Sequence, residues 1–363
     1  MDAEDAPAGA NDMEGRLART QTFAAIVVAI LVLATVVLAI TLERPDTDVE
    51  RSTWAFDMVQ LEQARDMGLT GEGVTVAIID TGIDPGHPCM KGVNVVAWLD
   101  LVNGRGQPYD DEGHGTAMAS IIAGRSPLRG GAPGVGIIAI KVLSDDHPFD
   151  DEVVADAIDF AMDPDGDGDY VDGADIISLS LGGEYEDIDI LLGTKTQAAV
   201  SQAVNHGVVV VAAAGNDGDS EDVALPSRLP QVISVGAIDR RGQIAPFSSR
   251  GNVSVDRPDP DKKPEVVAPG VDIVTAHRDG LYAQGSGTSQ ATALTSAAIA
   301  VALSHEPDLL RDGARGGSEA SVHEVKVALM TTARPLEGQS TPHDGRAGYG
   351  LVQAVDLALE LAR

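Results

Sequence analysis

The sequence is poor in cysteine and in positive charge. Cys89 is the only cysteine among 363 residues, so no disulfide can form within the chain and the fold depends on its core. Lysine and arginine number 25 against 56 aspartate and glutamate residues, which leaves a formal net charge of −31. A chain of this charge repels nucleic acid and anionic lipid headgroups, and both are therefore excluded as partners.

The acidic residues are spread along the chain and form no acidic tail, while 44% of the residues are apolar. Disorder is not expected, because long runs of Val, Ile and Ala recur. A surface rich in aspartate and poor in lysine suits concentrated salt, which screens the repulsion among carboxylates. We therefore predict an acidic surface of the halophilic type. The sequence contains no internal repeat and gives no indication of the oligomeric state.

Residues 22–42 contain no charged side chain. At about 1.5 Å per residue this stretch reaches roughly 31 Å, enough to cross the core of a bilayer. The rival interpretation is a cleavable signal peptide, whose apolar region usually has only about 7–15 residues. We predict a retained single-pass signal anchor, preceded by a short tail (residues 1–21) and followed by a linker (residues 43–53). Arg16 and Arg19 precede the span, and this small bias places the later residues outside the cytoplasm.

Residues 54–363 are predicted to form one domain in which buried strands alternate with helices. Continuous β-branched runs are typical of parallel strands that are covered on both faces, and they lie at residues 74–79, 136–142, 176–181, 208–213 and 232–235. Stretches with the apolar spacing of helices lie between and after them, at residues 116–123, 151–161, 195–205 and 290–304. The alternation predicts an α/β fold with a mostly parallel central sheet.

Three chemically reactive residues stand at the ends of these segments. Asp80 follows the first strand, His114 stands between Gly113 and Gly115, and Ser289 opens the last helix. Taken singly, each has a structural interpretation, as a turn aspartate, a turn histidine and a helix N-cap serine. Together they supply a nucleophile, a base that takes its proton and a carboxylate that orients the base.

Longer stretches around these residues carry a resemblance to a known family. The sequence reads VAIIDTGIDPGHP around Asp80, DEGHGTAMASIIAG around His114 and GTSQATA around Ser289. Further stretches read IISLSLGG, VVVVAAAGNDG, PFSSRG, PEVVAPGVDIVTA and GYGLVQA. Over residues 54–354 the chain resembles the subtilisin-like serine proteases (subtilases), in which aspartate, histidine and serine follow one another in this order.

The resemblance implies a three-layer αβα fold and a serine endopeptidase that cleaves polypeptides through an acyl-enzyme intermediate. By position, Asp80 orients His114, His114 acts as general base and acid, and Ser289 is the nucleophile. Asn216 matches the asparagine that supplies a side-chain amide to the oxyanion hole. The resemblance also assigns substrate-binding residues, which are Ser178, Leu179, Ser180, Leu181, Gly182 and Gly183 for an extended peptide and Ala213, Ala214 and Gly215 for the primary side-chain pocket.

The same residues give less support to the alternative functions. The alternative is a catalytically silent peptide-binding protein with the same fold, against which the intact Asp80, His114, Ser289 and Asn216 argue. A nucleotide-binding enzyme is not supported, because the glycines of GLTGEGVTVAII precede the strand. A related acid-active peptidase class uses glutamate in place of the histidine, so His114 favours neutral to alkaline activity.

An acidic loop raises the question of a metal. The stretch DPDGDGD carries carboxylates at alternate positions, as an oxygen-ligand loop does, on Asp163, Asp165, Asp167 and Asp169. The twelfth position of a helix-loop-helix calcium site is Ala174 here instead of glutamate, so a calcium site and a solvated acidic loop both stay open. The resemblance implies that the chemistry requires no cofactor and that structural calcium is expected.

Overall fold

In the computed structural model, the described residues are 51–144, 151–181, 193–218, 222–252 and 254–363. The chain divides into two compact units, Met1–Val49 and Glu50–Arg363, and the described residues belong to the second. The predicted tail and membrane span, residues 1–42, therefore lie outside the described residues, as does most of the predicted linker. Within the described ranges, no helix combines the length and the apolar character that crossing a membrane requires.

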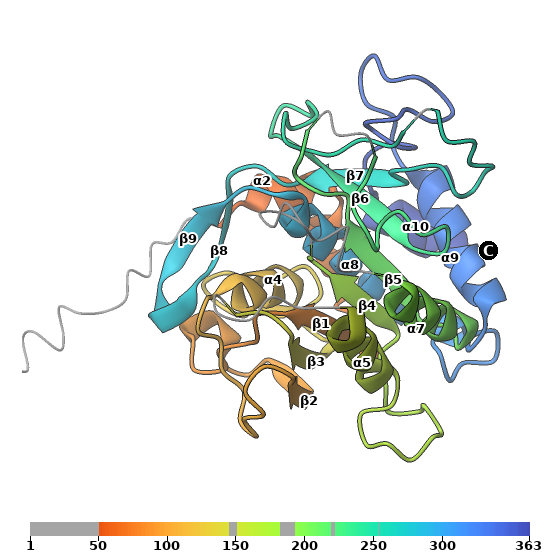
Figure 1. The fold of residues 1–363 in the computed structure, drawn as a ribbon. Helices are drawn as coiled ribbons and strands as arrows, with labels where there is room; N and C mark the ends of the chain where they lie inside the picture. The colour runs from red at the N-terminus through yellow and green to blue at the C-terminus, as the bar shows by residue number, and fades with distance from the viewer. Residues whose placement is uncertain (1–50, 145–150, 182–192, 219–221, 253) are drawn as a thin grey trace, which may run out of the picture. The chain divides into compact units, whose positions relative to one another are not determined.

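A seven-stranded sheet forms the centre of the described unit (Figure 1). All of its strand pairs are parallel, which confirms the prediction of a mostly parallel sheet. In spatial order the strands are β2 (Asn94–Asp100), β3 (Gly136–Lys141), β1 (Thr75–Asp80), β4 (Ile176–Leu179), β5 (Val209–Ala213), β6 (Ile233–Ile238) and β7 (Val266–Pro269). The predicted strands correspond to β1, β3, β4, β5 and β6.

The strands that were predicted from apolar runs are those whose residues are almost all buried. Every residue of β3, β4, β5 and β6 is buried, as their continuous apolar runs require. The edge strand β2 is largely half-buried or exposed although its residues 95–99 are all apolar, and the other edge strand, β7, has only four residues. A separate antiparallel pair, β8 (Ile273–Ala276) and β9 (Tyr282–Gly285), lies outside the large sheet.

Helices cover both faces of the sheet and complete the three layers (Figure 1). On one face α4 (His114–Ala123) packs against α8 (Thr288–His305), and on the other α5 (Asp151–Met162) packs against α7 (Thr194–Asn205). These are the four predicted helices, with ends that differ by two residues or fewer. The remaining described elements are α2 (Thr53–Met58), α3 (Leu61–Asp66), α9 (Glu319–Thr332), α10 (Ala354–Leu361) and the 3₁₀ turns η1 (Pro88–Met90), η2 (Arg278–Gly280) and η3 (Pro307–Leu309).

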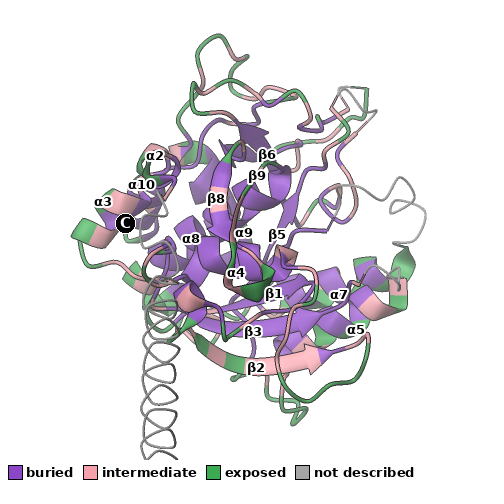
Figure 2. Ribbon diagram, turned by 90° about the vertical axis from the view of Figure 1, so that its left-hand side faces the viewer, coloured by how far each residue is buried: buried purple, intermediate pink, exposed green. Residues whose placement is uncertain are grey.

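Helix α8 runs through the core of the unit. Its residues from Thr288 to Leu303 are all buried, and Figure 2 shows the helix enclosed by other elements. Its Ala, Ser and Thr side chains are small enough to let α4 and the sheet approach closely. The first turn of α8 is consequently held in one position relative to the strands.

The carboxyl ends of the parallel strands share one edge of the sheet. Strand β1 ends at Asp80, β4 ends at Leu179 and β5 ends at Ala213, and β4 lies between the other two. The sequence pattern placed Asp80 directly after strand β1. In the structure Asp80 is instead the last residue of the strand. Open parallel sheets place their sites beyond this edge. Segments far apart in the sequence therefore meet where the candidate residues stand.

Candidate active site

Asp80 and His114 form a close pair. The Asp80 side chain is fully buried at the end of β1, while the His114 side chain, the first of α4, is 38% exposed. His114 Nδ1 lies 2.7 Å from Asp80 Oδ1 and 2.9 Å from Oδ2. With Nδ1 donating to the carboxylate, Nε2 is left as the acceptor, and it makes no hydrogen bond to any described residue. The pair has the arrangement of a base held by a carboxylate.

Glycines allow α4 to approach β1 at this point. Gly113 adopts a φ of 100°, a left-handed conformation that sets the entry into the helix. A Cβ on Gly115 would lie 2.1 Å from the carbonyl oxygen of Gly82, so any side chain there would push the helix away from the strand end. The Thr81 amide also donates to Asp80 Oδ1, at 2.7 Å, and fixes the carboxylate.

Burial and neighbouring charges act in opposite directions on the pKa of His114. Burial disfavours the imidazolium and lowers the pKa, whereas the charge and hydrogen bond of Asp80 and the charges of Asp110 and Glu112 raise it. The raising effects prevail, so the pKa of His114 lies above its ordinary value of 6.5. The neutral imidazole, which alone accepts a proton at Nε2, therefore prevails only above pH 6.5.

Ser289 lies at the start of α8, close to the ends of β4 and β5. Its side chain is buried, and its hydroxyl donates to the carbonyl oxygen of Ser180, just beyond β4, at 3.4 Å. Among the described residues no hydrogen bond joins Ser289 to His114. Catalytic hydrogen bonds are often long or poorly aligned before substrate binds, so this geometry is compatible with a nucleophile and its base.

Asn216, beyond the end of β5, lies beside the first turn of α8. Its Oδ1 accepts hydrogen bonds from the Thr288 amide at 2.9 Å and from the Thr288 hydroxyl at 3.0 Å. The Asn216 Nδ2 is close to Gly287, since a Cβ on that glycine would lie 3.6 Å from it. Oδ1 is thus occupied, and Nδ2 is the group that can donate to a ligand next to Ser289.

The predicted substrate-binding residues occupy different positions. Ser178 and Leu179 belong to β4 and pair with β1 on one side and β5 on the other, so their backbones are already used within the sheet. Ser180 and Leu181 follow the strand end and are buried, and Gly182 and Gly183 lie outside the described residues.

The residues predicted to line the primary side-chain pocket lie at and just beyond the end of β5. Ala213 is its last residue, and Ala214 and Gly215 continue toward Asn216. Ala213 and Ala214 are fully buried, and Gly215 has a φ of 109° with the Ser249 and Ala224 side chains close by. These small residues leave the chain closely packed just before the oxyanion candidate.

The acidic loop brings together three of its four aspartates. One carboxylate oxygen each of Asp163, Asp165 and Asp167 lies within 4.8 Å of the others. Asp169 does not belong to this group, and its carboxylate accepts the Val171 amide at 2.9 Å, as the other three carboxylates accept amides of the same loop. The cluster supplies oxygen ligands of the kind that calcium binds.

No sequence pattern singled out the polar residues behind the Asp80–His114 pair. Asp110 and Asp111 stand in the acidic stretch YDDEGHG, and Lys141 stands near the end of an apolar run. In the structure Lys141 is fully buried and the Asp110 carboxylate is surrounded by donors. The one available signal was a lysine in a run predicted to be buried, because a buried charge needs partners.

Comparisons with known proteins point to one family. A model of the subtilase family matches residues 71–350, most of the described unit. Serine protease AprX of Bacillus subtilis (strain 168) is 34% identical over 271 residues, which cover 67% of this chain and 60% of the relative. Minor extracellular protease Epr of the same strain is 30% identical over 313 residues, which cover 85% of this chain and 42% of the relative.

A shorter relative matches over nearly its whole length. Subtilisin DY of Bacillus licheniformis is 32% identical over 289 residues, which cover 78% of this chain and 92% of the relative. This chain therefore spans less than two thirds of AprX and of Epr, and most of subtilisin DY.

Proposed function

The chain belongs to the subtilase family, and from this premise we propose that it is a serine endopeptidase that hydrolyses polypeptides through an acyl-enzyme intermediate. The observation that carries the proposal is the Asp80–His114 pair at 2.7 Å, with Nε2 of a partly exposed histidine left without a partner among the described residues. The first turn of α8, with Ser289, lies beyond the neighbouring strand ends.

In the proposed mechanism Ser289 Oγ attacks the carbonyl carbon of the scissile peptide bond. His114 Nε2 takes the hydroxyl proton and passes it to the leaving amine, and Asp80 stabilises the imidazolium that forms in between. Water then hydrolyses the acyl-enzyme, with His114 again as the base. The developing oxyanion accepts hydrogen bonds from Asn216 Nδ2 and from the Ser289 amide.

The extended substrate pairs with the segment that leaves β4. Ser178 and Leu179 already have strand partners on both sides, so we assign the main-chain recognition to residues 180–183. The residue before the scissile bond enters the pocket bordered by Ala213, Ala214 and Gly215. The hydrogen bond from Ser289 to the Ser180 carbonyl supports this arrangement, because Ser180 is the first residue of the segment proposed to pair with substrate.

The rate of hydrolysis of an unfolded protein is expected to fall on the acidic side, with a midpoint above pH 6.5. The reason is the raised pKa of His114, because the imidazolium cannot accept the proton of Ser289. The measurement is kcat/KM for a denatured protein substrate from pH 5 to pH 9. If the protein hydrolyses the substrate at none of these pH values, the proposed function is wrong. If the rate stays flat down to pH 5, His114 is not the base.

Subtilases need no cofactor for catalysis, and we propose that calcium here has a structural role in the acidic loop. The residues fit the ion, because Asp163, Asp165 and Asp167 converge with carboxylate oxygens. Calcium that binds the folded state and not the unfolded state raises the free energy of unfolding. Chelation is therefore expected to lower the melting temperature by about 5 °C.

The calcium proposal is tested by melting in excess calcium and in chelator. Asp165→Asn should lose the difference between the two conditions. Asp239→Asn is the matched control and should keep it, since Asp239 also accepts backbone amides in an exposed turn but lies outside the loop. An unchanged melting temperature of the wild-type protein in chelator would overturn the proposal.

We further propose that residues 22–42 anchor the protein in the cell membrane and that the peptidase unit lies outside the cytoplasm. The uncharged stretch, long enough to cross a bilayer, supports the anchor, and Arg16 and Arg19 before it support the orientation. The net charge of −31 supports a setting of high ionic strength.

A further inference from the structure

Thr81 forms hydrogen bonds with both sides of the Asp80–His114 pair. Its amide donates to Asp80 Oδ1 at 2.7 Å, and its hydroxyl accepts the Gly115 amide at 2.8 Å. Gly115 directly follows His114, so one buried threonine contacts the carboxylate on β1 and the backbone next to the imidazole on α4. A displacement of Thr81 would therefore change the relation between the two groups.

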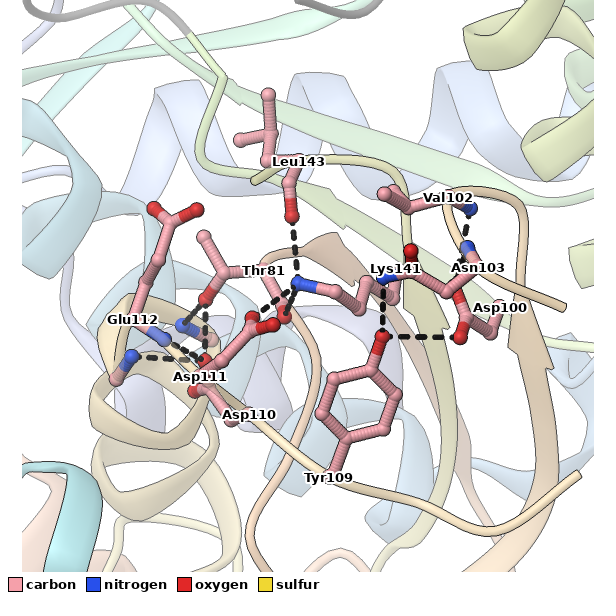
Figure 3. Close-up of polar contacts among 12 residues, drawn as sticks. Thr81, Asp100, Val102, Asn103, Tyr109, Asp110, Asp111, Glu112, Lys141 and Leu143 are labelled. Carbon is pink, nitrogen blue, oxygen red and sulfur yellow. Dashed lines mark hydrogen bonds and ion pairs between the residues drawn. The ribbon is translucent and has the colours of Figure 1, made fainter. Parts of the chain in front are cut away.

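The Asp110 carboxylate fixes Thr81 and the turn that leads into α4 (Figure 3). Its Oδ1 accepts the Thr81 hydroxyl at 2.9 Å, the Gly113 amide at 2.7 Å and the Glu112 amide at 3.1 Å. Its Oδ2 accepts the Thr116 amide at 2.8 Å and the Thr116 hydroxyl at 2.6 Å. The carboxylate thus holds residues on both sides of His114 and the residue that follows Asp80.

Lys141 holds Thr81 from the opposite side. Its ammonium group, buried at the end of β3, donates to the carbonyl oxygens of Thr81 and Leu143 and to Asp111 Oδ1, each at 2.7 Å. Figure 3 shows Lys141 reaching between the Thr81 carbonyl and the turn of Asp110 and Asp111. All three ammonium hydrogens are used, which satisfies the buried charge and ties β3, β1 and the turn together.

We propose that Asp110 is a positioning residue for the Asp80–His114 pair and acts through Thr81 and the amides that flank His114. The inference rests on the proposed function, because positioning matters only if His114 is the base. Five donors converge on one carboxylate, more than capping a turn requires, and they come from the residue after β1, from the turn before α4 and from α4 itself. A misplacement of about 1 Å can cost roughly 10²-fold in rate, so such a clamp has a catalytic effect without touching substrate.

The charge of Asp110 also affects a measurable quantity, the pKa of His114, which would not change if Asp110 had a purely structural role. The charged groups around His114 are Asp80 on β1 and Asp110 and Glu112 in the turn before α4. At the tip of the β8–β9 hairpin, the His277 ring lies near Gly113 and Arg278 donates to the Asp111 carbonyl. Removing the charge of Asp110 removes one of the interactions that raise the pKa of His114.

The test compares Asp110→Asn with Asp151→Asn in the full chain. Asp151 is a matched control, because its carboxylate accepts three backbone amides at the N-terminus of α7, on the opposite face of the sheet from α4. For Asp110→Asn we expect kcat to fall about 10- to 100-fold with little change in KM. The pKa of His114, followed by NMR of its ring signal and assigned with His114→Gln, should fall as well. Asp151→Asn should change neither quantity.

A second pair of variants applies if Asp110→Asn fails to fold. Thr81→Val removes the hydroxyl at constant shape and should lower kcat, and Thr81→Ser keeps the hydroxyl and should regain most of the loss. Wild-type kcat and an unmoved His114 pKa in folded Asp110→Asn would overturn the proposal, and so would equal kcat for the two Thr81 variants. If the wild-type protein hydrolyses nothing, the proposed function fails, while the His114 titration in Asp110→Asn still decides whether Asp110 acts on His114.

Discussion

Replacing Ser289 with alanine is expected to abolish the hydrolysis of an unfolded protein and the labelling by a fluorophosphonate probe. Alanine keeps the first turn of α8 but removes the oxygen that forms the acyl-enzyme. The expected loss in kcat is on the order of 10⁶, the size known for the corresponding change in subtilisin itself. Both quantities can be measured on purified protein, and the melting temperature reports whether the variant is folded.

A serine elsewhere on the same helix supplies the control. The Ser304 hydroxyl, near the end of α8, donates only to the Val301 carbonyl of its own helix, at 2.8 Å. Ser304→Ala should keep both activity and labelling. Equal labelling of wild type and Ser289→Ala would show that another residue is the nucleophile, and the assignment of Ser289 would then be wrong.

Replacing Asp80 with asparagine is expected to lower kcat on the order of 10⁴-fold. The carboxylate accepts the hydrogen from His114 Nδ1 at 2.7 Å, and an amide can present its nitrogen there and favour the wrong tautomer. Nε2 would then carry the proton and could not accept one from Ser289. The variant also loses the charge that raises the pKa of His114, so its residual activity should extend to lower pH.

Asp100 is the matched control for Asp80. It ends β2 as Asp80 ends β1, but its carboxylate accepts the amides of the following turn and the Tyr109 hydroxyl, and among the described residues it contacts no histidine. Asp100→Asn should keep kcat close to that of wild type if it is folded. Near-normal rates in Asp80→Asn would mean that another carboxylate orients His114.

Local patterns predicted the elements but could not predict their spatial order. The apolar runs of β1 and β4 indicate buried strands, and the chain alone does not say that β4 lies beside β1 while β3 lies on its other side. Strand order depends on contacts between distant segments, which no local pattern records. Edge strand β2 was not among the predicted strands although its residues 95–99 are apolar, because an apolar run this short does not by itself distinguish a strand from a piece of buried helix.

Some residues of the candidate site could be predicted from the sequence and others could not. Asp80, His114, Ser289 and Asn216 were found because their glycine-rich surroundings recur in a known family. Asp110 was not found, because an aspartate among acidic neighbours has the same local pattern whether its oxygens face water or five protein donors. Asp169 illustrates the converse, since it fits the alternating pattern of the loop and yet lies outside the group of three carboxylates that converge.

The division of the site between β1–α4 and α8 has a consequence for biosynthesis. During translation the segments with Asp80 and His114 leave the ribosome long before Ser289, and strands β3 to β9 are made in between. A growing chain therefore carries the proposed base without the proposed nucleophile and cannot cleave neighbouring nascent chains. On the proposed assignment, proteolytic competence arises only after α8 has been inserted against the sheet, so the topology delays the onset of activity until the strands before α8 have been made.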